Sequence, residues 1–382
     1  MAYAITDILR AQVTTKVVSR MAQSTSRILN QYNMAPGQSQ ELPVGHREAG
    51  YDVFNHSRAV GTTSAPGAPA TRITPQIVGR VNFTFARLNE ELFLPYEKIH
   101  NLRQVGGSAA QFDQLGANYI TLQERFMGER VANWRTILLI GMLRGGLYAH
   151  QSGDKIYFDY NSANALYQVD LKMPAGNMSQ LNMLGGGNLI DVSWSNPGAD
   201  IPAQLEAIDQ ALMQLCGQRL ERITCSGRLW SKYVLKNDAV QAGAGIANKP
   251  WETYRREVGV GPDGTPITDK FGVIAAVPWV EWHITNDGLD VGAPGATTWT
   301  QHVPDTNIFF GPNPAGRNDL FEMQLGDEPV VEYENGPVAA RMGLYTWTKR
   351  SDNPAGYEFF ALDNAMPASY VPACHGNGTV VF

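Results

Sequence analysis

The chain has 382 residues, of which 43% are hydrophobic and only 17% are charged, whereas soluble domains usually carry ~25% charged residues. This composition excludes an intrinsically disordered chain, which would be more charged and less aromatic. The low charge therefore indicates either an unusually neutral surface or a surface that is largely hidden in contacts.

Cysteine usage and the first residues indicate the compartment. Cys216, Cys225 and Cys374 form no C-x-x-C pair and are odd in number, which favours free thiols in a reducing cytosol. We expect no signal peptide, because the first residues contain neither a basic nor a continuous apolar stretch. We also expect no membrane contact, because the most apolar run, residues 137–143, is far shorter than the ~20 residues of a membrane span.

The formal net charge of -6 is unevenly distributed along the chain. Residues 1–103 contain 11 Lys/Arg and 7 Asp/Glu, a balance of +4, and the remainder contains 19 and 29, a balance of -10. A basic first quarter could bind an anion or the acidic body of another copy of the chain. The alternative is random variation in composition.

Residues 4–32 carry apolar side chains at steps of mostly three and four, which predicts an amphipathic helix. Its polar face is basic, because only Asp7 opposes Arg10, Lys16, Arg20 and Arg27. Such a face suits a contact with nucleic acid or a scaffold protein, and it is equally typical of a solvated helix surface. The apolar face needs a distant segment or another chain to pack on, since no adjacent segment is helical.

Residues 51–95 show the period of two that is typical of a strand, with Val81, Phe83 and Phe85 alternating with polar side chains. Residues 51–62 can form the returning strand, and residues 63–71 (TSAPGAPAT) a tip rich in Pro and Gly. Because a two-stranded ribbon is marginal in water, this long hairpin needs a surface to lie on.

A long helix is predicted over residues 111–148, which would extend ~55 Å if unbroken. Its apolar stripe begins with Phe112, Leu115, Tyr119, Leu122 and Phe126. Gly116 and Gly128 weaken the helix and suggest a kink.

The second half of the chain mixes short elements. Residues 155–173 predict a hairpin that turns at residues 161–164, and Asp200 is a predicted helix N-cap with Pro202 in the first turn. We expect a strand over residues 221–225, a helix over 226–237 and loops over 241–248 and 259–268. Further strands are predicted at residues 271–285, 306–311, 340–349, 357–362 and 379–382.

No motif predicts catalysis, a cofactor or a metal. The glycines of residues 259–264 match G-x-G-x-x-G, but Pro262 interrupts them and no helix follows, so we interpret them as a turn. Cys374 and His375 are adjacent but lack partner ligands. Glu90 and Glu91 would point to opposite faces of a strand, which does not suit an acid–base pair.

The order of these elements resembles the tailed-phage major capsid proteins of the Hong Kong 97 fold, in particular the branch typified by the lambda head protein E. Short segments are similar as well. They are Val169-Asp170-Leu171, Trp194 before the capped helix, Ser226 to Trp230 (SGRLW), and His302 to Gly311 (HVPDTNIFFG). The resemblance covers residue 50 to the end in order and spacing, while the first arm and the hairpin tip match in kind only.

The resemblance implies an α+β fold with five parts. These are an N-terminal arm (residues 1–45), an extended β-hairpin loop (46–105), a peripheral domain with a long spine helix (106–198), an axial domain (199–335) and C-terminal strands (336–382). It implies no enzymatic activity and no cofactor. Some relatives cross-link their subunits through a lysine, but Lys98 is the only lysine between residues 17 and 154, so we predict no such link.

The implied function is a self-assembling shell subunit of a tailed double-stranded DNA phage, forming hexamers and pentamers of an icosahedral virion capsid that assembles in the host cytoplasm. The implied partners are other copies, portal and scaffold proteins, a decoration protein and packaged DNA, and no membrane. The residues expected at subunit contacts are Arg10, Lys16, Arg20, Arg27, Arg58, Pro66, Pro69, Arg72 and Arg80.

Two alternatives stay open. A bacterial encapsulin-like compartment shell would have the same fold and would hold cargo enzymes in place of DNA. A hydrolase would need a nucleophile assembled from distant residues, for which Cys225 and Ser226 are the candidates.

Overall fold

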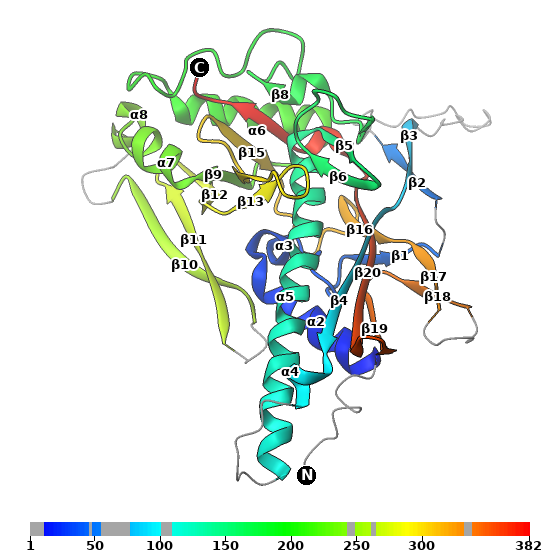
Figure 1. The fold of residues 1–382 in the computed structure, drawn as a ribbon. Coiled ribbons are helices and arrows are strands. Elements are labelled where there is room, and N and C mark those ends of the chain that lie inside the picture. The colour runs from blue at the N-terminus through cyan, green and yellow to red at the C-terminus, as the bar shows by residue number, and fades with distance from the viewer. Residues whose placement is uncertain are drawn as a thin grey trace, which may run out of the picture.

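The computed structural model describes residues 11–45, 48–54, 77–100, 109–242, 249–260, 265–331 and 338–382, and it has the expected mixed α+β architecture (Figure 1). The helices of this part are α2 (Ala11–Thr25), α3 (Arg27–Gln31), α4 (Tyr96–His100), α5 (Ala109–Arg144), α6 (Ile201–Leu215), α7 (Gly227–Leu229) and α8 (Asp238–Ala242). Three short turns complete them, at Ala175–Asn177, Trp230–Val234 and Pro372–Cys374.

A seven-stranded mixed sheet lies at one end of the molecule, in the order β10-β11-β12-β9-β15-β21-β8. Its strands are β8 (Met178–Ser179), β9 (Arg222–Ser226), β10 (Trp251–Val260), β11 (Pro266–Ile274), β12 (Val277–Thr285), β15 (Asn307–Gly311) and β21 (Gly376–Thr379). Three fully buried tryptophans lie in its core, where the ring of Trp282 packs against those of Trp194 and Trp230.

A five-stranded sheet lies along the other side of α5. It contains β1 (Glu41–Pro43), β4 (Ala86–Pro95), β16 (Phe321–Leu325), β19 (Tyr345–Asp352) and β20 (Ala355–Ser369). Three two-stranded sheets pair β2 (Glu48–Phe54) with β3 (Ile77–Thr84), β13 (Gly288–Val291) with β14 (Thr298–Gln301), and β17 (Asp327–Val331) with β18 (Val338–Met342). A three-stranded sheet has the order β6 (Lys155–Asp159), β5 (Leu147–Ser152), β7 (Tyr167–Val169).

The predicted long helix is present as α5, whose 36 residues correspond to ~54 Å and which runs between the two large sheets (Figure 1). The helix continues through Gly128. A Cβ atom there would lie 2.6 Å from Cβ of Met21, so this glycine lets α2 approach α5 closely.

The apolar stripe predicted for this helix packs against the core at Tyr119, Trp134 and Leu138 but is exposed at two positions between them. The side chains of Leu122 and Phe126 are exposed by 62% and 46%, whereas Ile120, Met127 and Val131 are buried. Two apolar rows run along α5, and α2 covers the row that contains Ile120.

The single helix predicted over residues 4–32 is wrong, because α2 ends at Thr25 and α3 begins at Arg27. Ser26 separates them: its hydroxyl accepts a hydrogen bond from the N–H of Leu29 and lies 2.7 Å from Oγ1 of Thr136 on α5. Residues 1–10, which include Arg10, lie outside the described residues. The apolar face of the first helix was expected to pack on a distant segment or on another chain. The structure shows a distant segment, since α2 packs on α5 and β19 of its own chain.

The base of the predicted hairpin is confirmed as β2 and β3, with Tyr51 opposite Val81. It lies on the end of β20, because the N–H of Phe54 donates to the carbonyl of Tyr370 at 2.9 Å and the Tyr51 and Tyr370 rings meet edge to face. Residues 86–95 do not extend this hairpin; they form β4, which pairs along β20. The tip, with Arg58, Pro66, Pro69 and Arg72, lies outside the described residues.

The second half of the chain departs from the predictions in strand pairing. The hairpin predicted over residues 155–173 is wrong, because β6 and β7 flank β5 on opposite sides and each pairs with it. The single strand predicted over residues 271–285 belongs to two strands, β11 and β12, and β10 was not predicted. The N-cap at Asp200 is confirmed, since its Oδ1 accepts a hydrogen bond from the N–H of Ala203 at 3.0 Å.

Candidate assembly surfaces

The basic side chains predicted for the N-terminal arm lie on its outer surface. Lys16 and Arg20 are exposed, one turn apart on α2, and neither makes an ion pair within the part of the chain that the structure describes. Arg27 is half exposed and lies 3.8 Å from Oδ1 of Asp269 on β11. The arm therefore presents free positive charge on the side that faces away from α5.

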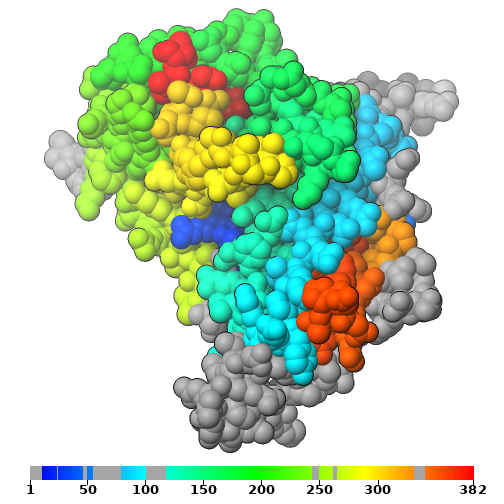
Figure 2. Space-filling model, viewed as in Figure 1, coloured from blue at the N-terminus to red at the C-terminus, as the bar shows by residue number. Residues whose placement is uncertain are grey.

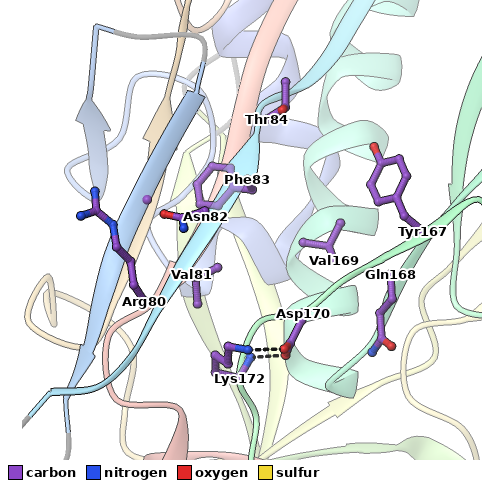
Figure 3. A pocket seen from close by; sticks show the side chains of 11 residues that line it. Arg80, Val81, Asn82, Phe83, Thr84, Tyr167, Gln168, Val169, Asp170 and Lys172 are labelled. Carbon is purple, nitrogen blue, oxygen red and sulfur yellow. Dashed lines mark hydrogen bonds and ion pairs between the residues drawn. The ribbon is translucent and has the colours of Figure 1, made fainter.

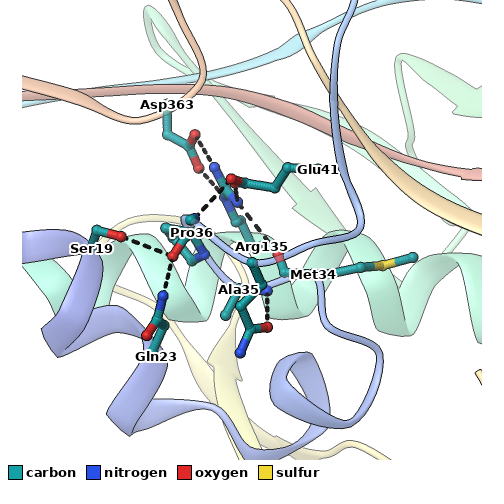
Figure 4. A network of polar contacts seen from close by, with 10 residues as sticks. Ser19, Gln23, Met34, Ala35, Pro36, Glu41, Arg135 and Asp363 are labelled. Atoms are coloured by element: carbon teal, nitrogen blue, oxygen red, sulfur yellow. Dashed lines mark hydrogen bonds and ion pairs between the residues drawn. The ribbon is translucent and has the colours of Figure 1, made fainter. Parts of the chain in front are cut away.

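A buried ion cluster fixes the arm to the molecule (Figure 4). Arg135 of α5 is fully buried and donates to both carboxylate oxygens of Asp363 on β20. It also bonds the carboxylate of Glu41 and, at 3.4 Å, the carbonyl of Met34, both of which belong to the arm. One guanidinium thus connects the arm, the long helix and the five-stranded sheet. The buried position of Arg135 could have been suspected from the sequence, because it is the one charged residue between residues 131 and 143.

A second buried network of hydrogen bonds connects the arm to the seven-stranded sheet. Nε2 of Gln31 donates to Oδ2 of Asp269 at 2.9 Å, and Nε2 of His283 lies 2.5 Å from the same oxygen. Burial alone would raise the pKa of Asp269, but the hydrogen bonds from His283 and from the N–H of Lys270, together with the nearby charge of Arg27, outweigh it and hold that pKa below its usual range. The arm is therefore bonded to both large sheets, and its inner face is unavailable to other chains.

A cavity of about 860 Å³ lies between β3 and β7 (Figure 3). Arg80, the last predicted contact residue that the structure describes, lies exposed on its rim, and Val81 and Val169 line it as buried side chains. Lys172 and Asp170 form an ion pair at the opposite rim. No sequence pattern predicts this cavity, because it is formed by two strands that are more than 80 residues apart along the chain.

Exposed apolar side chains gather at several places on the surface. Besides Leu122 and Phe126 on α5, Ile156 of β6 and Tyr167 of β7 are exposed. Trp299 of β14 is exposed by 58%. The short β13–β14 sheet stands out on the face of the molecule shown in yellow in Figure 2.

The residues considered for a hydrolase do not form a reactive site. Cys225 is fully buried, and burial raises the pKa of its thiol well above the usual range, which disfavours the thiolate. Ser226 is also fully buried, and its hydroxyl accepts a hydrogen bond from the N–H of Leu229 as a helix N-cap.

The described residues contain no candidate metal site and no candidate membrane-spanning helix. Within the described residues no group of three or more His, Cys, Asp or Glu side chains could hold a metal ion, and Cys374 and His375 are buried in the core. None of the helices in the described ranges is long and apolar enough to cross a membrane.

Comparison with known proteins gives a likeness in structure only. No family model and no curated protein sequence matches the chain. Among solved structures, it is similar to a putative capsid protein of a prophage from E. coli CFT073, with 11% identity over 80% of this chain and 81% of that one and a TM-score of 0.47.

Two further solved structures are similar to this chain at comparably low sequence identity. A phage-related protein from Bordetella bronchiseptica RB50 is 11% identical over 95% of this chain and 96% of that one, with a TM-score of 0.46. The SrpI encapsulin from Synechococcus elongatus PCC 7942 is 13% identical over 90% and 85%, with a TM-score of 0.41. These values are too low to carry a functional argument.

Proposed function

We propose that this chain is the major capsid protein of a tailed double-stranded DNA phage, and that it assembles as hexamers and pentamers of an icosahedral shell that encloses the genome. In this proposal α5 is the spine helix of the peripheral domain and residues 199–335 form the axial domain. Residues 46–105 form the extended loop, which reaches a neighbouring subunit beyond its base at β2 and β3, while β4 within this range pairs with β20 of its own chain. The fold is then of the Hong Kong 97 type, with the division into parts expected above.

The observation that carries the proposal is the uncovered apolar row on α5. A helix of 36 residues that is packed on one side exposes Leu122 and Phe126 on the other. Burying apolar surface contributes ~25 cal/mol per Å², so this row gains free energy when another chain covers it. The outer face of α2 adds the free charges of Lys16 and Arg20, which suit the acidic remainder of another copy.

The proposal also covers the binding partners of the chain and its location. Further copies of the chain are the main partner, and portal, scaffold and decoration proteins are the others, with packaged DNA held by proximity. The shell belongs to the virion and assembles in the host cytoplasm. The shell is then held by non-covalent contacts alone, because Lys98, at the base of the hairpin, is the only lysine between residues 17 and 154.

Electron microscopy and size-exclusion chromatography of the purified chain, alone and with a co-expressed scaffold, test this function. We expect capsomers, tubes or closed shells. A chain that stays monomeric under both conditions would contradict the proposal. Shells that contain protein cargo and exclude DNA would identify a compartment shell instead.

A further inference from the structure

Two of the three buried cysteines contact each other in the core. Cys216 is the C-cap of α6, and Cys374 ends the short turn Pro372–Cys374, which packs against α6 close to the C-terminal end of the chain (Figure 1). Both side chains are fully buried, and a hydrogen bond joins the two thiols. The fold therefore brings together two cysteines that lie far apart in the sequence.

The hydrogen bonds around these cysteines define the role of each thiol. The S–H of Cys216 donates to the carbonyl of Leu212, one turn earlier on α6, at 3.3 Å. The sulfur of Cys216 is therefore left to accept a hydrogen bond from the S–H of Cys374. This hydrogen bond, together with burial, raises the pKa of the Cys374 thiol well above its usual range. Cys374 is thus a thiol at neutral pH and reacts slowly while the core is closed.

The backbone holds both cysteines in place. Cys216 belongs to the last turn of α6, where its N–H makes a helical hydrogen bond. On the other side, the buried Nδ2 of Asn177 donates to the carbonyls of Ala373 and His375 at 3.0 Å and 2.8 Å, which fixes the residues before and after Cys374. The contact between the two sulfur atoms is therefore built into the fold.

We propose that Cys216 and Cys374 form an intramolecular disulfide when the folded protein meets a peroxide, and that this bond ties α6 to the C-terminal segment. Two thiols in hydrogen-bond contact need only a further approach of their sulfur atoms to reach the ~2.05 Å of an S–S bond. Cys225 is equally buried, but it lies within β9, which is paired on both sides by β12 and β15, and it takes no part.

The oxidation proceeds in two steps. The sulfur of one cysteine bonds to an oxygen of hydrogen peroxide while the O–O bond breaks, which gives a sulfenic acid and one water. The sulfur of the other cysteine then attacks the sulfenic sulfur. The S–S bond forms, the S–O bond breaks, and the oxygen leaves as a second water with the proton of the attacking thiol. Two thiols and one peroxide thus give one disulfide and two waters.

The disulfide would act on the stability of the protein. It closes a loop that spans residues 216–374, and closing a long loop restricts the unfolded chain and so stabilises the folded one. In a reducing cytosol the pair stays as two thiols, and a shell released from the host meets oxidising surroundings. That occasion rests on the proposed function, whereas the reaction belongs to the single chain.

Peptide mapping of the parent chain tests the bond. The folded chain is freed of reductant, treated with hydrogen peroxide, unfolded, and its remaining thiols are blocked with iodoacetamide. We expect one blocked thiol in place of three, and the tryptic peptides 173–219 and 351–382 joined to each other. Cys225 lies in the separate peptide 223–228 and should carry the blocking group. A link that contains Cys225, or oxygenated cysteines without a link, would overturn the inference.

Variants and a denatured control test whether the fold selects the pair. Cys216→Ala and Cys374→Ala should each abolish the link, and Cys225→Ala, the matched control, should keep it. Circular dichroism checks that each variant folds, and the peptide map of the parent decides the question where one does not. The parent treated with peroxide in urea should link its three cysteines in mixed pairs. The same mixture from the folded chain would show that no contact directs the reaction.

Thermal unfolding measures the tie between α6 and the C-terminal segment. The oxidised parent should unfold about 5 °C or more above the reduced one, and dithiothreitol should reverse this shift. Peroxide should not raise the unfolding temperature of Cys374→Ala. Equal temperatures for the oxidised and reduced parent would contradict the tie.

The outcomes separate this inference from the proposed function. Shells that form from a chain whose cysteines never link would leave the function standing and remove the disulfide. A linked pair in a chain that never assembles would support the disulfide and contradict the function.

Discussion

Arg135 and Asp363 form a fork of two hydrogen bonds inside the protein, with Nε 2.6 Å from Oδ2 and Nη2 2.8 Å from Oδ1. Both side chains are fully buried. Burial alone would lower the pKa of Arg135, but the charges and hydrogen bonds of Asp363 and Glu41 outweigh it and raise that pKa above its usual range. The guanidinium therefore stays charged at every pH at which the protein is folded.

Replacing one partner of this pair should destabilise the protein strongly. We expect Arg135→Met to lower the free energy of unfolding by ~3–5 kcal/mol, because it leaves the carboxylate of Asp363 buried without its counter-charge. The double variant Arg135→Met/Asp363→Leu should recover part of this loss. Urea denaturation of the single and double variants measures the coupling, and strictly additive losses would contradict it.

Glu124 predicts a pH dependence of stability. It is buried on α5, and burial raises the pKa of its carboxyl to about 7 from the ordinary value of 4.5. The folded state therefore disfavours the charged form, and the contribution of this group to stability declines as pH rises from about 4.5 to above 7. The loss at pH 8 should approach ~3 kcal/mol at ~1.4 kcal/mol per pKa unit.

The test is to compare Glu124→Gln with the parent chain in its unassembled form at pH 5.5 and pH 8. The variant should be the more stable at pH 8 and should lose less stability between the two values. Glu129→Gln, at a half-exposed position on the same helix, is the control and should keep the parent's dependence. An unchanged dependence in Glu124→Gln would show that another group titrates.

The sequence predicted the elements whose cause is local. The cap at Asp200 and the alternation around Val81 are short-range patterns, and both are present. The break at Ser26 was missed because its hydroxyl is also held by Thr136, 110 residues away. The pairing of β6 and β7 with β5 was missed for the same reason, since a strand pattern does not name its partner.

The exposed row of α5 shows a second reason why a structural feature could not be predicted from the sequence. Both apolar rows of this helix satisfy the helical period, and only the partner helix decides which one is buried. Gly128 favours burial of the row that contains Ile120, because the absence of a side chain at Gly128 leaves room for Met21 of α2 to pack there. The cavity beside Arg80 could not be predicted at all, since no local pattern brings β3 and β7 together.

The approach of α2 to α5 gives a third prediction. Gly128→Ala should lower the free energy of unfolding by ~1–3 kcal/mol through overpacking, even though alanine favours a helix by ~1 kcal/mol. The added Cβ would meet Cβ of Met21 at 2.6 Å and backbone atoms of Val18 and Ala22 at 3.1 Å, which cannot move aside as a flexible side chain can. Thermal and urea unfolding measure the effect. A stabilised variant would show that α2 shifts without cost.

The exposed row of α5 gives the fourth prediction, which concerns assembly. Leu122→Gln and Phe126→Ser should change the free energy of unfolding of the monomer by less than ~0.5 kcal/mol, because both side chains lie at the surface. If another subunit covers this row, the same variants should raise the protein concentration needed for capsomers or shells, since each loses apolar area that assembly buries.

Light scattering and electron microscopy of a concentration series measure that threshold. Thr121→Gln is the matched control, because it changes an exposed polar neighbour of Leu122 on the same helix and should leave the threshold unchanged. If Leu122→Gln and Phe126→Ser assemble at the parent's concentration, the row stays in solvent within the shell. The contact that holds the subunits would then have to lie elsewhere, on the arm or at the hairpin.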